Sequence, residues 1–375
     1  MRILCVANIR LPTEKAHGIQ VMKACEAFVN SGQEVLLLVP KRRTHIKTEP
    51  HAYYGIKKQF PIRRLFTLDT VSFGTLGFVL QSISFGVAAA LYVRRRHCDV
   101  VYYRDEWALF VFMLLGARRT IWESHDGAWN LPARFVAKRV RGLVVVTNGA
   151  KEFYLSRGIP EEKIHVTPNG IDLAEFAHPE SKEVARTRLG LPREVKIAMY
   201  VGRLDGWKGT NTLLEASQLL PSDVRVVIIG GEEKQIEQLR QAYPNVIFLG
   251  FRPYTELSHN QAAADVLVVP NTGKDPVSVR FTSPLKLIAH MASGRPIVTS
   301  DLPSIRELVS DAEALLVEPD NPMALAEGIL RALNSTVGTP LAEAAKARVE
   351  ELDWSARAEG IFEFVKRVFD MPTRG

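Results

Sequence analysis

The chain has 375 residues, of which 46% are hydrophobic and 24% charged, a globular composition that suggests about two domains of roughly 150 residues each. Its three cysteines are too few and too scattered for a disulfide framework or a metal site, which fits a reducing cytoplasm. The first 150 residues carry 22 Lys and Arg against 10 Asp and Glu, whereas the rest carry 26 against 31. A basic first half favours an anionic surface or substrate and indicates two domains with different functions.

Apolar runs in the first half alternate with helical patterns, which is typical of βα units around a parallel sheet. The opening run has no cleavage pattern behind it, so it is expected to be a strand rather than a signal peptide. Helices are expected between the runs, for example at 18–30 and 129–138. The predicted strands of this half are 2–9, 34–40, 99–105, 120–126, 142–148 and 164–169.

The stretch 70–93 contains no acidic or basic side chain, and basic residues gather around it at 41–47, 57–58, 63–64 and 94–96. About 18 such residues are enough to nominate a membrane span, but predicted strands of one sheet on both sides argue against a crossing. Two interpretations stay open, namely helices buried in or lying on a domain, and a patch in an anionic membrane interface. Nucleic acid is not an expected partner, because none of its usual binding motifs is present.

The second half restarts the alternation and predicts a second doubly wound domain. Its predicted strands are 196–203, 224–231, 245–251, 266–271, 296–300 and 314–319. Turn residues without a strand pattern separate the halves, and apolar residues at helical spacing near the end predict a packed helix. The predicted domains are 1–170 and 194–350, joined by a linker at 171–193 and followed by a C-terminal helix at 351–375.

Two cations follow the first predicted strand of the second half, in "YVGRLDGWKG". Arg203 and Lys208 at the end of a strand can clamp a diphosphate, the arginine by its fork and the lysine as a point charge. The alternative is a solvated loop with two ordinary cations.

A third cation lies in "FTSPLKLIAHMASG", residues 281–294. Ser283 is expected to cap a helix that begins at Pro284, which puts Lys286 near its third position. A lysine is unfavourable there unless an anion is bound, and the free amides of a helix start bind phosphate. Lys286 is therefore expected at a phosphate site, the alternative being that it extends into solvent.

In this order the motifs resemble the retaining glycosyltransferases of the GT-B fold, in particular glycosyltransferase family 4 (glycosyl transferases group 1). The similar segments are "HGIQ", "ESHD", "VTPNGID", "GR…K", "FLGF…Y.EL…ADVLVVPN", "SPLKL…MASGRPIV", "IRELV" and the closing "DW" helix. The resemblance covers nearly the whole chain and is strongest from about 164 to 365. It implies two Rossmann-like domains that face a cleft, with the C-terminal helix packing back toward the first domain.

The resemblance also implies roles for individual residues. His125 would face the transferred sugar as the catalytic residue, unless it is a strand-end histidine bonded to Asp126. Gly18 would approach the sugar or acceptor, and Phe251 and Arg252 would contact the nucleotide base. The implied donor-binding residues are Gly18, Arg203, Lys208, Phe251, Arg252, Ser283, Pro284, Leu285 and Lys286.

One departure from the family pattern concerns two glutamates, of which the first lies near the donor sugar and the second binds the ribose of the nucleotide. Phe281 and Ala289 occupy those positions here. Alanine cannot accept hydrogen bonds from ribose hydroxyls, so Ala289 is the more serious loss.

The expected function is retaining transfer of a sugar from a nucleotide-diphosphate sugar to a glycan or lipid-linked acceptor, in bacterial surface polysaccharide or glycolipid synthesis. No cofactor or metal is expected, since the sequence has no Asp-x-Asp or His/Cys cluster. The expected location is cytoplasmic, peripheral at the inner face of the membrane. A non-catalytic nucleotide-sugar or lipid-binding subunit and an epimerase on the same fold stay as alternatives. A dinucleotide oxidoreductase is disfavoured, because the first βα turn lacks G-x-G-x-x-G.

Overall fold

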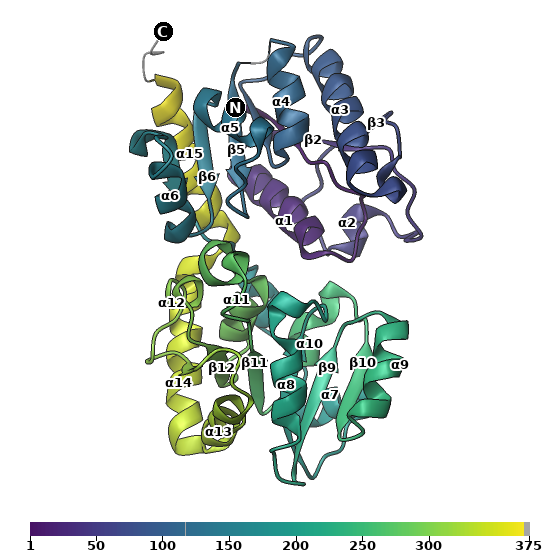
Figure 1. Ribbon diagram of the computed structural model, residues 1–375, viewed down its shortest axis with the longest axis vertical. Helices are drawn as coiled ribbons and strands as arrows, with labels where there is room; N and C mark the ends of the chain where they lie inside the picture. The colour runs from purple at the N-terminus through teal and green to yellow at the C-terminus, as the bar shows by residue number, and fades with distance from the viewer. Residues whose placement is uncertain (117, 371–375) are drawn as a thin grey trace. The chain divides into compact units, whose positions relative to one another are not determined.

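A computed structural model describes residues 1–116 and 118–370 (Figure 1). They form two compact units, each a parallel sheet covered by helices. The first unit consists of Met1–Pro168 and the segment from Trp354 onward, and the second is Asn169–Asp353. Residues 171–193, expected to be a linker, lie in the second unit and include a 3₁₀ turn and a helix.

The sheet of the first unit has the strand order β3-β2-β1-β4-β5-β6-β7, all parallel. The order runs outward from β1 in both directions, which is the doubly wound arrangement. Its strands are β1 (Arg2–Val6), β2 (Glu34–Pro40), β3 (Ile62–Leu65), β4 (Val100–Tyr103), β5 (Thr120–Ser124), β6 (Gly142–Val145) and β7 (Ile164–Val166).

The strand β3 was not predicted. Its sequence "IRRL" has no apolar run, and Arg63 and Arg64 are exposed. The strand lies at the edge of the sheet, and its one strand partner among the described residues is β2. An edge strand is held by backbone hydrogen bonds along one side, so its side chains need not be apolar.

Seven helices described for the first unit are α1 (Ala16–Asn30), α2 (Pro50–Tyr53), α3 (Gly74–Val93), α4 (Glu106–Leu114), α5 (Leu131–Arg139), α6 (Asn148–Leu155) and α15 (Trp354–Asp370). The last of these, α15, packs against α1 and β6. Phe362 contacts Phe28 with ring centroids 5.1 Å apart, and Arg141 donates to the carbonyl oxygen of Val368. The expected return of the C-terminal helix to the first domain is thereby confirmed.

The long apolar helix α3 is attached to its unit by one face. Asn8, just after β1, donates to Ser82 and accepts from Gln81, at 2.8 Å in both cases. Gly86 lets α4 approach so closely that an added Cβ would lie 2.7 Å from the carbonyl oxygen of Ala108. Packing of this kind agrees with a helix of the domain, the first of the two interpretations of this stretch.

The sheet of the second unit has the order β10-β9-β8-β11-β12-β13, again parallel and doubly wound. All six predicted strands are present. They are β8 (Lys196–Val201), β9 (Val224–Ile229), β10 (Val246–Gly250), β11 (Val266–Val269), β12 (Ile297–Ser300) and β13 (Leu315–Val317).

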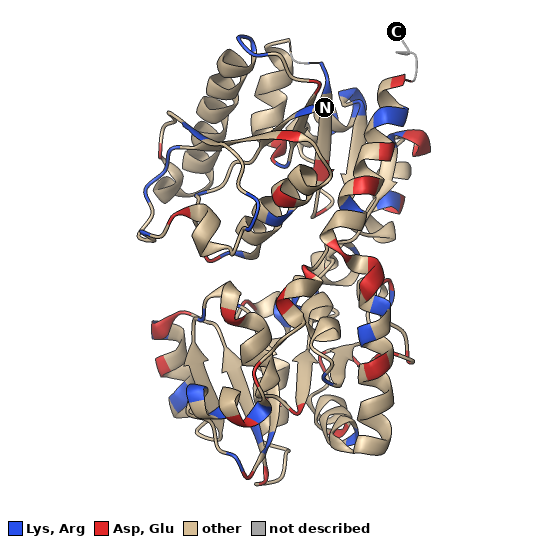
Figure 2. Ribbon diagram, turned by 180° about the vertical axis from the view of Figure 1, so that it is seen from behind, with Lys and Arg blue, Asp and Glu red and all other residues tan. Residues whose placement is uncertain are grey.

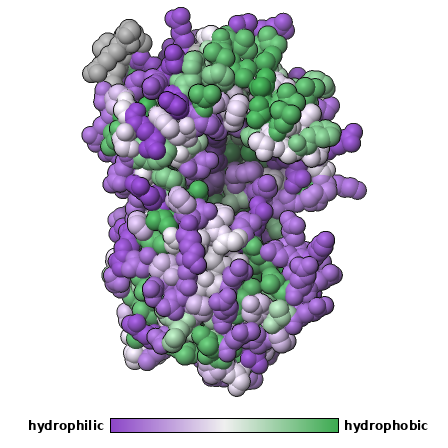
Figure 3. Space-filling model, viewed as in Figure 1, coloured by the Kyte–Doolittle hydropathy of each residue, from purple (hydrophilic) through white to green (hydrophobic). Residues whose placement is uncertain are grey.

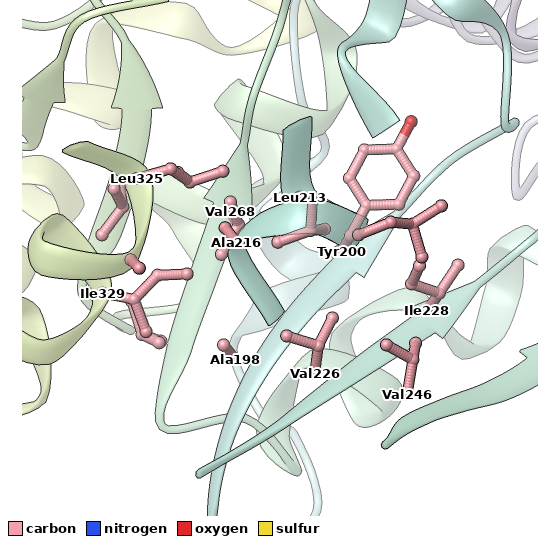
Figure 4. Packing of buried hydrophobic residues seen from close by; sticks show 14 of the residues in the cluster. Ala198, Tyr200, Leu213, Ala216, Val226, Ile228, Val246, Val268, Leu325 and Ile329 are labelled. Atoms are coloured by element: carbon pink, nitrogen blue, oxygen red, sulfur yellow. The ribbon is translucent and has the colours of Figure 1, made fainter. Parts of the chain in front are cut away.

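The helices described for the second unit are α7 (Lys182–Leu189), α8 (Thr210–Ser217), α9 (Glu233–Ala242), α10 (Leu257–Ala262), α11 (Leu285–Ala292), α12 (Pro303–Arg306), α13 (Pro322–Leu333) and α14 (Ser335–Arg348). Figure 4 shows part of the core, where α8 and α13 pack their apolar faces on the sheet. Leu213 and Ile329 are fully buried there against Val226 and Val268.

In both units the strand order reverses next to the first strand, between β1 and β4 and between β8 and β11. Ligands of open α/β sheets bind outside the carboxyl ends of the strands at such a reversal. The fold therefore directs attention to the loops that follow β8 and β11 in the second unit, and β1 and β4 in the first.

Gly18 lies in the first turn of α1, and the hydroxyl of Tyr54 fills the space beside it. An added Cβ would be 2.2 Å from that oxygen, which also bonds the backbone of Thr13. Gly18→Ala should therefore lower the free energy of unfolding by about 1–3 kcal/mol, the usual cost of overpacking. Urea denaturation measures this effect. Gly360→Ala on α15, where the nearest atom lies at 3.5 Å, is the control and should be neutral or stabilising.

Candidate donor site and the His125 network

The loop after β8 brings two of the predicted cations onto one carboxylate. Asp205 Oδ1 lies 3.1 Å from Arg203 Nη2, and its Oδ2 lies 3.6 Å from Lys208 Nζ. Burial lowers the pKa of Lys208, Asp205 opposes that shift and Arg203 adds to it. One carboxylate thus faces two cations at the strand reversal of the second sheet.

This loop is pressed against the residues that follow β11. Gly209 has φ 66°, and a Cβ there would lie 1.6 Å from the carbonyl oxygen of Pro270, so only glycine fits. The amide of Thr272 donates to the carbonyl oxygen of Trp207 at 3.2 Å. The neighbouring Asn271 is fully buried, and neither polar atom of its side chain has a partner in the described chain. Buried polar groups without partners are uncommon in proteins and need an explanation, such as a ligand.

The third cation, Lys286, lies on α11. Its Nζ is buried and has no hydrogen-bond partner among the described residues. It lies 4.6 Å from the centroid of the Tyr200 ring, and the Tyr200 hydroxyl donates to the carbonyl oxygen of Arg203 at 2.7 Å. Burial lowers the pKa of Lys286 well below its usual value, and nearby Lys208 adds to that effect. The expected solvent-exposed alternative for Lys286 is therefore wrong.

The start of α11 differs by one residue from the prediction. The capping residue is Pro284 and not Ser283, so Lys286 is the second helical residue. The Ser283 hydroxyl accepts from the amide of Asn169 at 3.0 Å, and its carbonyl oxygen accepts from the Asn169 side chain at 2.6 Å. Ser283 thus joins the first residues of the second unit to the helix start. Because its hydroxyl accepts from Asn169, it does not cap the helix.

Two backbone amides at this helix start remain available. Leu287 and Ile288 donate to the carbonyl oxygen of Pro284, whereas the N–H groups of Leu285 and Lys286 have no protein acceptor in the described chain. Free amides at a helix N-terminus favour an anion. They lie on the same helix turn as the buried ammonium of Lys286.

The other donor residues implied by the resemblance lie elsewhere in the second unit. Phe251 is 49% exposed and Arg252 is also exposed, directly after β10, which is two strands away from β8. Their contact with a base stays a prediction. Phe281 and Ala289 are both buried, and Ala289 belongs to an apolar cluster around α11.

In the first unit, His125 follows β5. Its Nε2 lies 2.6 Å from Oε1 of Glu123. Asp126 accepts from the amide of Ala128, and no hydrogen bond between Asp126 and His125 is found among the described residues. His125 is therefore a strand-end histidine bonded to a carboxylate, as the alternative interpretation predicted, but the carboxylate is Glu123 and not Asp126. A role facing the sugar stays a prediction.

Four residues next to the predicted site were missed in the sequence, namely Tyr200, Asp205, Glu123 and Arg357. Asp205 lies two residues from Arg203 and Glu123 two residues from His125, so acidic residues beside the predicted cation and histidine were a readable signal. Tyr200 was hidden inside an apolar strand. Arg357 is 234 residues from the Glu123 it contacts, and no local pattern indicates that pair.

The described residues contain no group of three or more His, Cys, Asp or Glu side chains that could hold a metal ion. The expectation that no metal is needed stays a prediction.

The fold is that of the GT-B glycosyltransferases. Residues 18–175 match the family described as Glycosyltransferase Family 4, and residues 195–335 match the one described as Glycosyl transferases group 1. The chain therefore belongs to the GT-B glycosyltransferases of group 1 and family 4.

Among similar proteins, D-inositol 3-phosphate glycosyltransferase of Xylanimonas cellulosilytica is 30% identical over 223 residues, covering 55% of this chain and 52% of its own length. Phosphatidyl-myo-inositol mannosyltransferase of Mycolicibacterium smegmatis is 27% identical over 226 residues, covering 58% and 55%. The chain spans about half the length of the curated relatives it matches.

A solved structure, HepE of Anabaena in complex with UDP-glucose, superposes with a TM-score of 0.78 at 18% identity. The superposition covers 98% of this chain and 99% of HepE. At this identity the likeness concerns the fold, which confirms the GT-B architecture.

Lys286→Met should stabilise the ligand-free protein by about 1 kcal/mol, because it removes a buried ammonium without a protein partner and loses only the contact with Tyr200. The lowered pKa of Lys286 means that the folded protein holds this proton less tightly than the unfolded chain. The buried ammonium therefore destabilises the folded protein fully at pH values below the lowered pKa, and this destabilisation fades as pH rises toward about 10.4. The stabilisation by Lys286→Met should accordingly shrink with rising pH.

Urea denaturation of both proteins over a pH series checks this. Lys234→Met, at an exposed position on α9, is the matched control and should give no such gain. A loss of stability in Lys286→Met at neutral pH would show that the ammonium is well accommodated without a ligand.

Proposed function

We propose that the chain is a retaining glycosyltransferase that moves a sugar from a nucleotide-diphosphate sugar to a glycan or lipid-linked acceptor. The observation that carries the proposal is the buried Nζ of Lys286, which has no partner in the described chain and lies near Lys208. Arg203 adds a third positive charge, and Asp205 is the carboxylate that pairs with two of the three. A diphosphate would supply the missing negative charge.

The comparisons support the same ligand and acceptor classes. HepE, whose fold this chain shares, is described in complex with UDP-glucose. Two relatives carry names that specify an inositol phosphate or a phosphatidylinositol acceptor. An acceptor with a phosphorylated or lipid-linked polyol is therefore a reasonable choice for the first assays, in a pathway that builds surface polysaccharide or glycolipid.

The proposed chemistry is stabilisation of charge on the leaving group. As the bond between the sugar C1 and the diphosphate breaks, negative charge grows on the phosphate, and Arg203, Lys208, Lys286 and the free amides of α11 would stabilise it. The acceptor oxygen forms its bond to C1 on the same face, and its proton passes to the leaving phosphate oxygen. His125 would orient the sugar. The three cations supply the charge that a metal ion would otherwise provide.

A second candidate is a non-catalytic subunit that binds a nucleotide sugar or lipid. It is favoured by one observation, that apolar Phe281 and Ala289 occupy the positions of the two family glutamates and are both buried. Binding of a nucleotide sugar without transfer to any acceptor would support this candidate. Transfer of a sugar would exclude it.

Arg203→Ala and Lys208→Ala should each weaken binding of the donor about 10-fold to 100-fold, since a hydrogen bond to a charged group contributes about 1.5–3 kcal/mol. Thermal stabilisation by a panel of nucleotide sugars identifies the donor first, and calorimetry with UDP, GDP and ADP then measures the change. Lys234→Ala, which removes the same charge from an exposed position of the same unit, is the control.

Unchanged affinity and unchanged turnover in both variants would show that the diphosphate binds elsewhere. A loss of turnover with unchanged donor affinity would instead place the two cations in the transfer step alone.

A lipid-linked acceptor would lie in a membrane. We propose that the protein binds an anionic membrane through an exposed surface of the first unit. Among the described residues, Val71–Val93 is the one helical segment long and apolar enough to cross a membrane, by length and composition only. Its buried face is held by the polar contacts described above. The α3 stripe, formed by Leu76, Leu80, Ile83, Val87 and Leu91, is 38% to 72% exposed on the other face.

The α3 stripe continues into further exposed apolar side chains, Phe66, Leu68, Phe73 and Leu114. Figure 3 shows an apolar patch over the region of α3 and α4. Exposed arginines lie on β3, which packs against α3, and directly after the helix at 94–96, and Figure 2 shows basic residues in the loops of this unit. An apolar face bordered by basic residues is typical of proteins that lie in the interface of an anionic bilayer.

Leu80→Ser combined with Leu91→Ser should reduce binding to vesicles of phosphatidylcholine and phosphatidylglycerol roughly tenfold or more, because burying a leucine contributes about 1.5–3 kcal/mol. Replacing Arg94, Arg95 and Arg96 by glutamine should reduce binding at low salt and weaken its dependence on salt. Co-sedimentation with the vesicles measures both effects.

The control is Leu219→Ser with Leu330→Ser, two exposed leucines of the second unit, which should leave vesicle binding unchanged. Equal binding of all variants, or no binding of the wild type at low salt, would contradict a membrane role for the α3 stripe.

A further inference from the structure

Glu123, on β5, is a buried carboxylate that accepts three hydrogen bonds. Its Oε2 accepts from the Tyr102 hydroxyl at 2.6 Å. Its Oε1 lies 2.6 Å from Nε2 of His125 and accepts from Nη2 of Arg357 at 2.8 Å. The side chains of Glu123 and Arg357 are each 4% exposed, so this is a network in the interior of the first unit.

The surrounding charges keep Glu123 ionised. Burial alone would raise its pKa, but Arg357 and Arg104 outweigh burial and hold the pKa of Glu123 well below its usual value. Burial and Arg104 lower the pKa of His125, so the imidazole is neutral at pH 7. A neutral imidazole beside an ionised carboxylate must place its single proton on the nitrogen that faces the carboxylate, because a carboxylate can only accept.

The proton of His125 is therefore on Nε2, and Nδ1 has a free lone pair. The structure gives Nδ1 no protein partner within the described residues, and the His125 side chain is 22% exposed at the carboxyl end of β5. A partly exposed nitrogen with a free lone pair can accept a hydrogen bond from a hydroxyl group, and it cannot donate one.

The C-terminal helix holds this arrangement in place. Arg357, on α15, donates through Nε to the carbonyl oxygen of Pro168 at 2.8 Å and through Nη2 to Glu123. One guanidinium thus fixes both the carboxylate and the end of the chain segment that leaves β7. Removing one partner of such a buried pair leaves an unpaired charge, which is costly.

We propose that Glu123 is a positioning residue that acts through His125. It holds the Nε2 proton inside the first unit, so that Nδ1 accepts a hydrogen bond from a hydroxyl of the sugar or acceptor, and Arg357 fixes Glu123 for that purpose. The ligand class, a hydroxyl donor, rests on the proposed function, whereas the state of the imidazole does not.

The state of His125 can be read directly by nitrogen-15 NMR of the whole protein, in which the two neutral forms of histidine have different spectra. The wild type should show the form protonated on Nε2. Glu123→Met, which keeps a side chain of similar length and removes the acceptor, should give a mixture of the two forms. The form protonated on Nδ1 in the wild type, or an unchanged spectrum in Glu123→Met, would overturn the proposal.

Tyr102→Phe is the matched control for Glu123→Met. It removes the hydrogen bond to Oε2 and leaves the one between Oε1 and His125, so the form protonated on Nε2 should persist. A mixture in this variant as well would show that general loosening of the network, and not the carboxylate charge, sets the proton position.

Two replacements of His125 test the accepting nitrogen. Asparagine can place its carbonyl oxygen near the position of Nδ1, whereas glutamine extends toward the position of Nε2 and Glu123. His125→Asn should retain about tenfold more transfer activity than His125→Gln, the value of one hydrogen bond. Equal losses, or a more active glutamine variant, would overturn the role of Nδ1.

The two kinds of measurement separate this proposal from the proposed function. A wild-type protein that binds no nucleotide sugar and transfers no sugar would count against the proposed function. The NMR spectra of the wild type, Glu123→Met and Tyr102→Phe would then decide the positioning role of Glu123 without any assay of activity.

Discussion

The second unit depends on one electrostatic constraint, a surplus of positive charge in a place with little water. Lys286 lies on a helix start that already carries partial positive charge, and its ammonium is buried over the Tyr200 ring near Lys208. In the described chain without a ligand, the ammonium has only its contact with the Tyr200 ring and no hydrogen-bond acceptor. An anion would make the arrangement favourable. Ligand binding should therefore raise the free energy of unfolding of this region above that of the ligand-free protein.

The first unit solves the opposite problem with its own residues. There a buried carboxylate, Glu123, is fully supplied with donors from β4, the end of β5 and the C-terminal helix. These two buried groups, Lys286 and Glu123, thus differ in whether their charge is compensated within the described chain. An uncompensated group points to a ligand, whereas a compensated group points to the precise placement of a neighbour, in this case His125.

Periodicity was enough to predict twelve of the thirteen strands that the described residues form, because parallel strands buried on both faces are continuous apolar runs. The edge strand β3 was not predicted, because its sequence has no apolar run. The cations of the donor site were readable from their place after a strand or at a helix start. The environment of these cations could not be predicted from the sequence, since the burial of Lys286 depends on Tyr200, which comes from another part of the chain. Ser283 showed the same limit, because a tertiary contact with Asn169 took it from its expected capping role.

The bond between Arg357 and Glu123 joins residues 234 positions apart, and the whole second unit lies between them in the chain. On the ribosome, the seven strands of the first unit emerge well before the helix that completes it. Arg357 cannot bind Glu123 until the second unit has been synthesised. The second unit, which is continuous in sequence, can fold as soon as it emerges. The domain synthesised first is thus the one that finishes folding last.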